Sequence, residues 1–85
     1  MIAHIQGKLV EKNPTDVVID CGGVGYHINI SLHTYSLLPN SDQIKLFTYL
    51  QVKEDAHTLF GFFEKSEREI FKVLLSVSGI GASIA

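Results

Sequence analysis

The sequence predicts a mainly β domain followed by a helix. Three observations support this prediction. Five short runs alternate β-branched or aromatic residues with polar ones, turn-forming residues separate these runs, and the spacing of apolar residues becomes helical after residue 63. With 85 residues, 46% of them hydrophobic and 19% charged, the chain can form one core, and its composition argues against disorder.

The first three strands are expected at residues 2–12, 17–21 and 26–31. In the first, Ile5, Gly7 and Leu9 share one face, and Gly7 indicates a bulge or a bend. Residues 13–16 (Asn-Pro-Thr-Asp) form a turn, because proline fixes φ and the Asn and Asp side chains bond their own backbone. The glycine-rich residues 22–25 are a hairpin connection and not a phosphate-binding loop, since a strand pattern follows them. Strands two and three are therefore an antiparallel pair.

A short helix is expected at residues 32–38, capped by Ser31, with Leu32, Tyr35 and Leu38 facing inward. The fourth strand has one apolar face, made by Ile44, Leu46, Thr48, Leu50 and Val52, and residues 58–63 are the fifth. Five strands with a helix between the third and fourth match a five-stranded OB-fold Greek-key barrel covering residues 1–63. A five-stranded barrel of the SH3 type stays open as the alternative.

Residues 64–85 are predicted to form a helix and the start of a truncated helix-hairpin-helix. Ser66-Glu67-Arg68-Glu69 has the pattern of a capping box, in which Glu69 reaches back to the N–H of Ser66. The apolar stripe that can dock on the barrel consists of Ile70, Phe71, Leu74, Leu75 and Val77. Gly79, Ile80 and Gly81 then form a turn whose amides can bind a DNA phosphate, although a plain connector between helices is the alternative.

Two adjacent acids, Glu54 and Asp55, are expected at the end of the hairpin made by the fourth and fifth strands. Folding does not require acids there, because hairpin turns are normally built from pairs such as Asn-Gly that adopt positive φ angles. A solvated turn and a functional acidic tip are both open at this point.

Charge and cysteine content limit the possible functions. Seven basic and nine acidic residues give a net charge of −2, so any DNA-binding role must be local. The single Cys21 can form neither an intramolecular disulfide nor a paired-cysteine zinc site, and a buried thiol is expected. No apolar run reaches the roughly 18 residues of a membrane span, and the first residues lack a basic and apolar leader. A cytoplasmic location without membrane association is therefore expected.

Several motifs together resemble the RuvA family, the Holliday-junction-binding subunits of bacterial branch-migration complexes. They are Met1-Ile2, Gly-Gly-Val-Gly-Tyr at 22–26, Lys-Glu-Asp-Ala at 53–56, Leu-Phe-Gly-Phe at 59–62 and Val-Ser-Gly-Ile-Gly at 77–81. The resemblance covers essentially the whole chain. It implies a non-catalytic homotetramer that recognises four-way junction DNA by shape and serves recombination, DNA repair and the SOS response. It also implies a RuvB motor ATPase, bound through a domain absent here, a RuvC resolvase that shares the junction, and no cofactor.

The resemblance assigns roles to individual residues. Glu54 and Asp55 match the family's strand-separating acidic pin. The phosphate-binding residues that it implies are Gly79, Ile80 and Gly81, with Ser83 and Lys53 as further contacts. Ala82 and Ser83 stand where many members have proline and lysine, which predicts a weaker phosphate contact at this turn.

Two other functions stay open. A generic OB-fold module could bind single-stranded nucleic acid, or mediate oligomerisation, through an aromatic face formed by Phe47, Tyr49, Phe60 and Phe62, although such residues more often fill a core. A metal-dependent enzyme could use Glu54, Asp55 and His57 as ligands, although adjacent acids on a hairpin tip rarely preorganise an ion.

Overall fold

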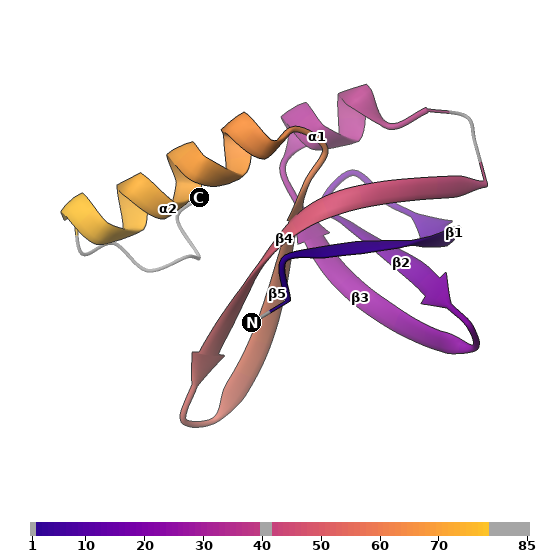
Figure 1. Ribbon diagram of the computed structural model, residues 1–85, viewed down its shortest axis with the longest axis horizontal. Coiled ribbons are helices and arrows are strands. Elements are labelled where there is room, and N and C mark those ends of the chain that lie inside the picture. The colour runs from indigo at the N-terminus through magenta and orange to yellow at the C-terminus, as the bar shows by residue number, and fades with distance from the viewer. Residues whose placement is uncertain (1, 40–41, 79–85) are drawn as a thin grey trace.

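The computed structural model describes residues 2–39 and 42–78. Within them the elements are β1 (His4–Lys12), β2 (Asp16–Cys21), β3 (Val24–Ile30), α1 (Leu32–Leu37), β4 (Gln43–Lys53), β5 (Ala56–Phe62) and α2 (Lys65–Ser78). Figure 1 shows the strands curving around one another, with α1 and α2 on the same side of the sheet and the hairpin between β4 and β5 extending away from the helices.

The strands form a closed barrel in the order β1-β2-β3-β5-β4. Neighbouring strands are antiparallel except for β3 and β5, which are parallel and joined through Asn29↔Phe60 and Ile30↔Gly61. This order, with α1 between β3 and β4, matches the predicted OB-type Greek key. The fold class is thus confirmed for the barrel and the helix after it. The truncated helix-hairpin-helix falls on residues 79–85, outside the described residues, and the division at residue 63 stays a prediction.

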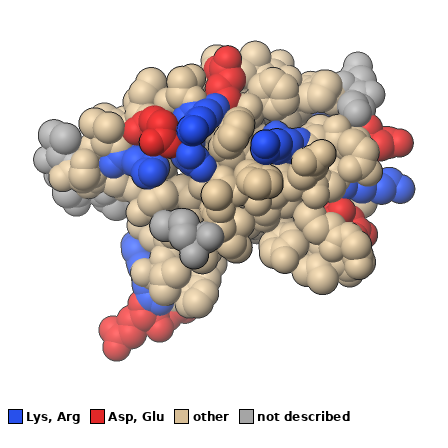
Figure 2. Space-filling view, viewed as in Figure 1, with Lys and Arg blue, Asp and Glu red and all other residues tan. Residues whose placement is uncertain are grey.

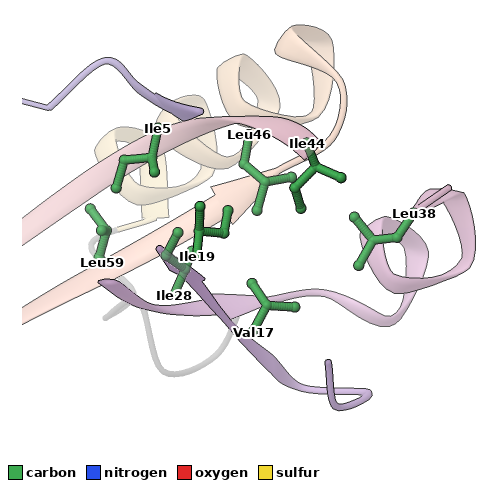
Figure 3. Packing of buried hydrophobic residues seen from close by; sticks show 8 residues of the cluster. All are labelled: Ile5, Val17, Ile19, Ile28, Leu38, Ile44, Leu46 and Leu59. Atoms are coloured by element: carbon green, nitrogen blue, oxygen red, sulfur yellow. The ribbon is translucent and has the colours of Figure 1, made fainter. Parts of the chain in front are cut away.

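The barrel core contains side chains from all five strands and from Leu38, the residue that follows α1 (Figure 3). Its buried members are Ile5, Val17, Ile19, Ile28, Leu38, Ile44, Leu46 and Leu59. The period-2 patterns predicted this well: Ile5 and Gly7 are buried in β1, and Ile44, Leu46 and Thr48 are buried in β4. Alternation along each strand therefore places one apolar row inside the barrel.

Glycine is required at position 7 for a reason other than the predicted bulge or bend. The irregularity in β1 lies between Leu9 and Glu11, and not at Gly7. A Cβ atom on residue 7 would collide with the carbonyl oxygen of Asp20 and lie 3.0 Å from the Sγ of Cys21. Glycine is therefore needed here because the backbones of β1 and β2 approach closely, a reason that strand alternation does not reveal.

The β2–β3 connection is shorter than expected. Gly22 and Gly23 have φ angles of 63° and 99°, so the turn consists of these two residues, and β3 begins at Val24. Positive φ at both central positions is the feature of the type I′ turn, which suits the twist of a hairpin. The carboxylate of Asp20 accepts the N–H of Gly23 at 2.7 Å and reinforces the turn.

The cap of α1 is confirmed, but its inward face is not as predicted. The Ser31 side chain accepts the N–H of Thr34 at 3.0 Å. Leu32 is 67% exposed, whereas Leu38 and Thr34 are buried. The expectation for Leu32 was wrong because Thr34 faces the barrel, where its hydroxyl accepts the N–H of Phe63 at 3.3 Å.

The capping box predicted at the start of α2 was also wrong. The helix begins at Lys65, so Ser66 lies inside it, and the Glu69 carboxylate binds Arg68 at 2.9 Å and Lys72 at 3.6 Å. The docking stripe is narrower than predicted as well. Phe71 is buried and Leu75 is half-buried, whereas Ile70 and Leu74 are exposed. No helix in the described part of the chain is long and apolar enough to cross a membrane.

Candidate nucleic-acid interface

The β4–β5 hairpin continues past the barrel as a two-stranded extension, here called the arm (residues 51–58; Figure 1). Pairing along the arm is regular from Gln51↔Thr58 to Lys53↔Ala56. Val52 shares a strand face with Thr48, yet Val52 is 62% exposed while Thr48 is 2% exposed. The same face of β4 is therefore core at its root and solvent-exposed near its end.

Glu54 and Asp55 are the two turn residues at the end of the arm, here called the acidic tip. Both are exposed, and neither carboxylate forms a hydrogen bond or ion pair within the described residues. Neither has a positive φ, which rules out the type I′ and II′ turns. Figure 2 shows the acidic atoms of the arm gathered at the outer edge of the molecule. The tip thus presents two unneutralised charges to solvent.

Lys53 precedes the tip as the last residue of β4 and pairs with Ala56 across the strands. Its side chain is exposed and makes no ion pair within the part of the chain that the structure describes. Two unit charges about 4 Å apart interact by roughly 1 kcal/mol in bulk water and several-fold more near a low-dielectric surface. The arm can therefore repel phosphates at its very end while a cation one residue behind attracts them.

The predicted phosphate-binding turn lies beyond the end of α2 in the sequence. Gly79, Ile80, Gly81 and Ser83 lie outside the described residues, and their assignment stays a prediction. What the structure does give is the helix that leads to them, since α2 runs through Ser78 and is docked on the barrel.

The aromatic face proposed for single-strand binding is occupied by the protein itself. Phe71 of α2 packs against three of its rings, with centroid distances of 5.6 Å to Tyr49, 5.3 Å to Phe60 and 5.2 Å to Phe62. The fourth ring, Phe47, lies beneath the cationic ends of Lys45 and Arg68. Because stacking needs an open ring face, this arrangement counts against the generic single-strand alternative.

The metal-site alternative has no structural support. Among the described residues, no group of three or more His, Cys, Asp or Glu side chains could hold an ion, and this includes Glu54, Asp55 and His57.

Cys21 is half-buried and not fully buried as expected, with its thiol donating to the carbonyl of Gln6 at 3.3 Å.

Sequence reasoning missed the polar contacts that orient α2. Glu67 binds two hydroxyl groups of the α1 region, and Arg68 donates to the carbonyl of Ala3 at 2.8 Å. An acid in the first turn of a helix is ordinarily explained by the helix dipole, so Glu67 carries no separate sequence signal for its contact with α1.

Comparison with known proteins identifies the fold and its arm together. The family described as RuvA N terminal domain matches residues 1–61, which include all of the barrel strands except the last residue of β5, together with the acidic tip. The chain belongs to the RuvA family. The resemblance recognised from the motifs is thereby confirmed.

The RuvA relatives align over the whole of this chain. It is 76% identical over 85 residues to the Holliday junction branch migration complex subunit RuvA of Flavobacterium psychrophilum and 66% identical to that of Christiangramia forsetii. It is 52% identical over 86 aligned residues to the RuvA subunit of Neisseria meningitidis. The chain spans 44% of the length of each of these three relatives.

Proposed function

We propose that this chain acts as a non-catalytic DNA-binding part of a branch-migration complex, recognising four-way junctions by shape in recombination and repair. The names of its RuvA relatives, subunits of a Holliday junction branch migration complex, support this role. The observation that carries the proposal is the acidic tip, two exposed carboxylates held away from the barrel and without a partner among the residues that the structure describes.

The arm can act on DNA because its root is fixed. Thr48 is buried where β4 leaves the barrel, and its hydroxyl donates to the carbonyl of Ile2 at 2.6 Å. Gly61 of β5 lies against Ile28 and Leu46 of the core. A tip anchored in this way cannot simply bend aside when a phosphate approaches, so electrostatic repulsion acts on the DNA strands and pushes them apart.

We further propose that four copies assemble around a four-way junction, so that Glu54 and Asp55 of each copy surround the point where the strands cross. Repulsion there keeps the centre open, while backbone amides and Lys53 hold the arms of the junction by their phosphates. Binding of this kind depends on shape and weakens as salt increases. A RuvB-type ATPase supplies the energy and a RuvC-type resolvase shares the junction, both in the cytoplasm, and the chain needs no cofactor of its own.

The same proposal covers the domain organisation. Residues 1–63 form the barrel domain, and residues 64–85 form a helix and the beginning of a helix-hairpin-helix domain. Ile70 and Val73 of α2 are 61% and 57% exposed, which is expected for a helix that also belongs to a second domain. In that domain Gly79, Ile80 and Gly81, with Ser83, would contact a phosphate.

A gel-shift assay on the full-length protein tests the role of the tip, comparing four-way junction with linear duplex. Glu54→Gln combined with Asp55→Asn removes both charges at nearly constant size. Because each lost repulsion is on the order of 1 kcal/mol, duplex affinity should rise by roughly five-fold or more, and the preference for the junction should fall. The matched control, Glu11→Gln with Asp42→Asn, removes two exposed acids away from the arm and should preserve the preference.

An unchanged junction preference in the tip variant would remove the acidic tip from the mechanism. Equal affinity of the unmodified protein for oligo-dT and for the junction would favour the generic single-strand alternative instead.

A further inference from the structure

Glu67, in the first turn of α2, is held by two hydroxyl groups that belong to the start of α1. Its Oε2 accepts the hydroxyl of Ser31 at 2.7 Å, and its Oε1 accepts the hydroxyl of Thr34 at 2.7 Å. Thr34 is fully buried and Glu67 is half-buried. Both oxygens of one carboxylate are thus used to connect two helices that are separated by more than 30 residues in sequence.

The backbone sets the direction of both hydrogen bonds. The Ser31 oxygen already accepts the N–H of Thr34 at 3.0 Å, and the Thr34 oxygen accepts the N–H of Phe63 at 3.3 Å. Each hydroxyl therefore has its proton left to donate, and a carboxylate is the side chain that accepts from both in short, charge-assisted bonds. We refer to the side chains of Ser31, Thr34 and Glu67 as the carboxylate clamp.

The clamp is one of several contacts that locate α2 on the barrel. Phe71 packs on the aromatic rings of β4 and β5, and Arg68 donates to the carbonyl of Ala3, next to β1. Since successive residues of a helix turn by about 100°, Phe71 lies roughly 40° from Glu67 and 60° from Arg68 around the axis. The two polar contacts therefore flank the aromatic one and bind α2 to two different elements.

Apolar packing does not replace the clamp on its side of the helix. A cleft of about 240 Å³ remains there, lined by Ile30, Phe60, Ile70 and Leu74 among others. Ring contacts centred on Phe71 fix the distance between helix and sheet, but they allow the helix to swing toward or away from this cleft. The clamp closes the cleft at the end where α2 begins and opposes that swing.

We propose that Glu67 is a positioning residue that fixes the direction of α2 relative to the acidic tip. Because α2 rises about 1.5 Å per residue, residue 78 lies roughly 10 Å beyond Phe71, and a swing of about 20° would move it by roughly 4 Å. That displacement exceeds the length of a hydrogen bond to phosphate, about 3 Å. The consequence for junction binding rests on the proposed function, but the positioning itself does not.

The direct test is a distance measurement on this chain by pulsed electron spin resonance. Nitroxide labels are attached at Val52→Cys on the arm and Ser76→Cys near the end of α2, both exposed, with Cys21→Ser to remove the native thiol. The parent should give one narrow distance distribution. Glu67→Ala should shift its mean by roughly 3 Å or about double its width, as expected for a swing about Phe71. Glu11→Gln is the matched control, because Glu11 is an exposed acid near the end of β1 that lies farther along the strand from Ala3, and it should leave the distribution unchanged.

A second variant guards against loss of folding. Thr34→Val keeps the buried volume and removes the hydroxyl, so it should change the distance distribution in the same way as Glu67→Ala. Because both substitutions break the same hydrogen bond, combining them should have little further effect. Circular dichroism checks that each variant is folded. A distribution that matches the parent in both Thr34→Val and folded Glu67→Ala would overturn the proposal. Failure of the unmodified protein to prefer junctions would instead remove the proposed function and leave this result standing.

Discussion

Phe71 anchors α2 in an aromatic cluster that is distinct from the barrel core, so α2 and the barrel can unfold separately. It is 5% exposed and contacts three aromatic rings, and with Phe62 it forms a cluster distinct from the barrel core. None of the eight buried core residues comes from α2. Truncation of a buried Phe to Ala costs about 3–5 kcal/mol. An isolated helix of 14 residues is only marginally stable in water, so without Phe71 the structure of α2 would depend mainly on the polar contacts of Glu67 and Arg68.

We therefore expect Phe71→Ala to release and unfold α2 while the barrel stays folded. Circular dichroism at 222 nm should lose most of its helical signal, whereas backbone amides of β1, β2 and β4 should keep their protection from hydrogen exchange. Val73→Ala is the matched control, since Val73 is 57% exposed on the same helix, and it should change the free energy of unfolding by no more than about 0.5 kcal/mol.

Two results would refute this reasoning. If Phe71→Ala abolished protection in the barrel together with the helical signal, the two clusters would form one cooperative unit. If the helical signal persisted unchanged, the carboxylate clamp and Arg68 would be sufficient to hold α2 without the aromatic contact.

Other predictions concern the barrel. Gly7→Ala should lower the free energy of unfolding measured in urea by about 1–3 kcal/mol, because the new Cβ atom would collide with the Asp20 carbonyl oxygen. Gly25→Ala is the control and should have a much smaller effect, since its Cβ atom would meet its nearest neighbour at an ordinary 3.4 Å. Equal effects of the two substitutions would contradict the argument that β1 and β2 approach closely at Gly7. The hydrogen bond from His27 and that from Asn13 lower the pKa of the Asp16 carboxyl below 3.8. The ionised Asp16 carboxylate therefore contributes its full stabilisation above its ordinary pKa and loses it as the pH falls below that value. Asp16→Asn should consequently flatten the acid side of a plot of melting temperature against pH. An unaltered slope would show that the pair of Asp16 and His27 does not contribute to stability.

Strand patterning and turn chemistry were sufficient to predict the barrel. The alternation in β1 and β4 identified the buried rows, and Gly22 and Gly23 marked a hairpin turn, because these signals depend only on neighbouring residues. Errors arose where a distant residue decides the outcome. Thr34 displaced Leu32 as the inward residue of α1 because its partner, Glu67, comes from α2, and no local pattern reveals that contact.

The candidate site was predictable in part for the same reason. Two acids in a hairpin turn are visible in the sequence, and their exposure follows from their charge. The length of the arm beyond the core was not visible, because Val52 continues the apolar alternation of β4 although it lies outside the barrel. Nor did the sequence reveal how α2 is oriented relative to the tip, which depends on contacts with α1, with β5 and with Ala3.

The regular pairing of the arm restricts how its length can change. Successive residues of a strand point to opposite faces, so an insertion of one residue in each strand would exchange the two faces between the root and the tip. Inserting two residues in each strand would preserve the faces and move Glu54 and Asp55 outward by about 7 Å. Reach in this hairpin is therefore adjustable in coarse steps only, and a homologue that needs a slightly different reach must change the twist of the ribbon instead.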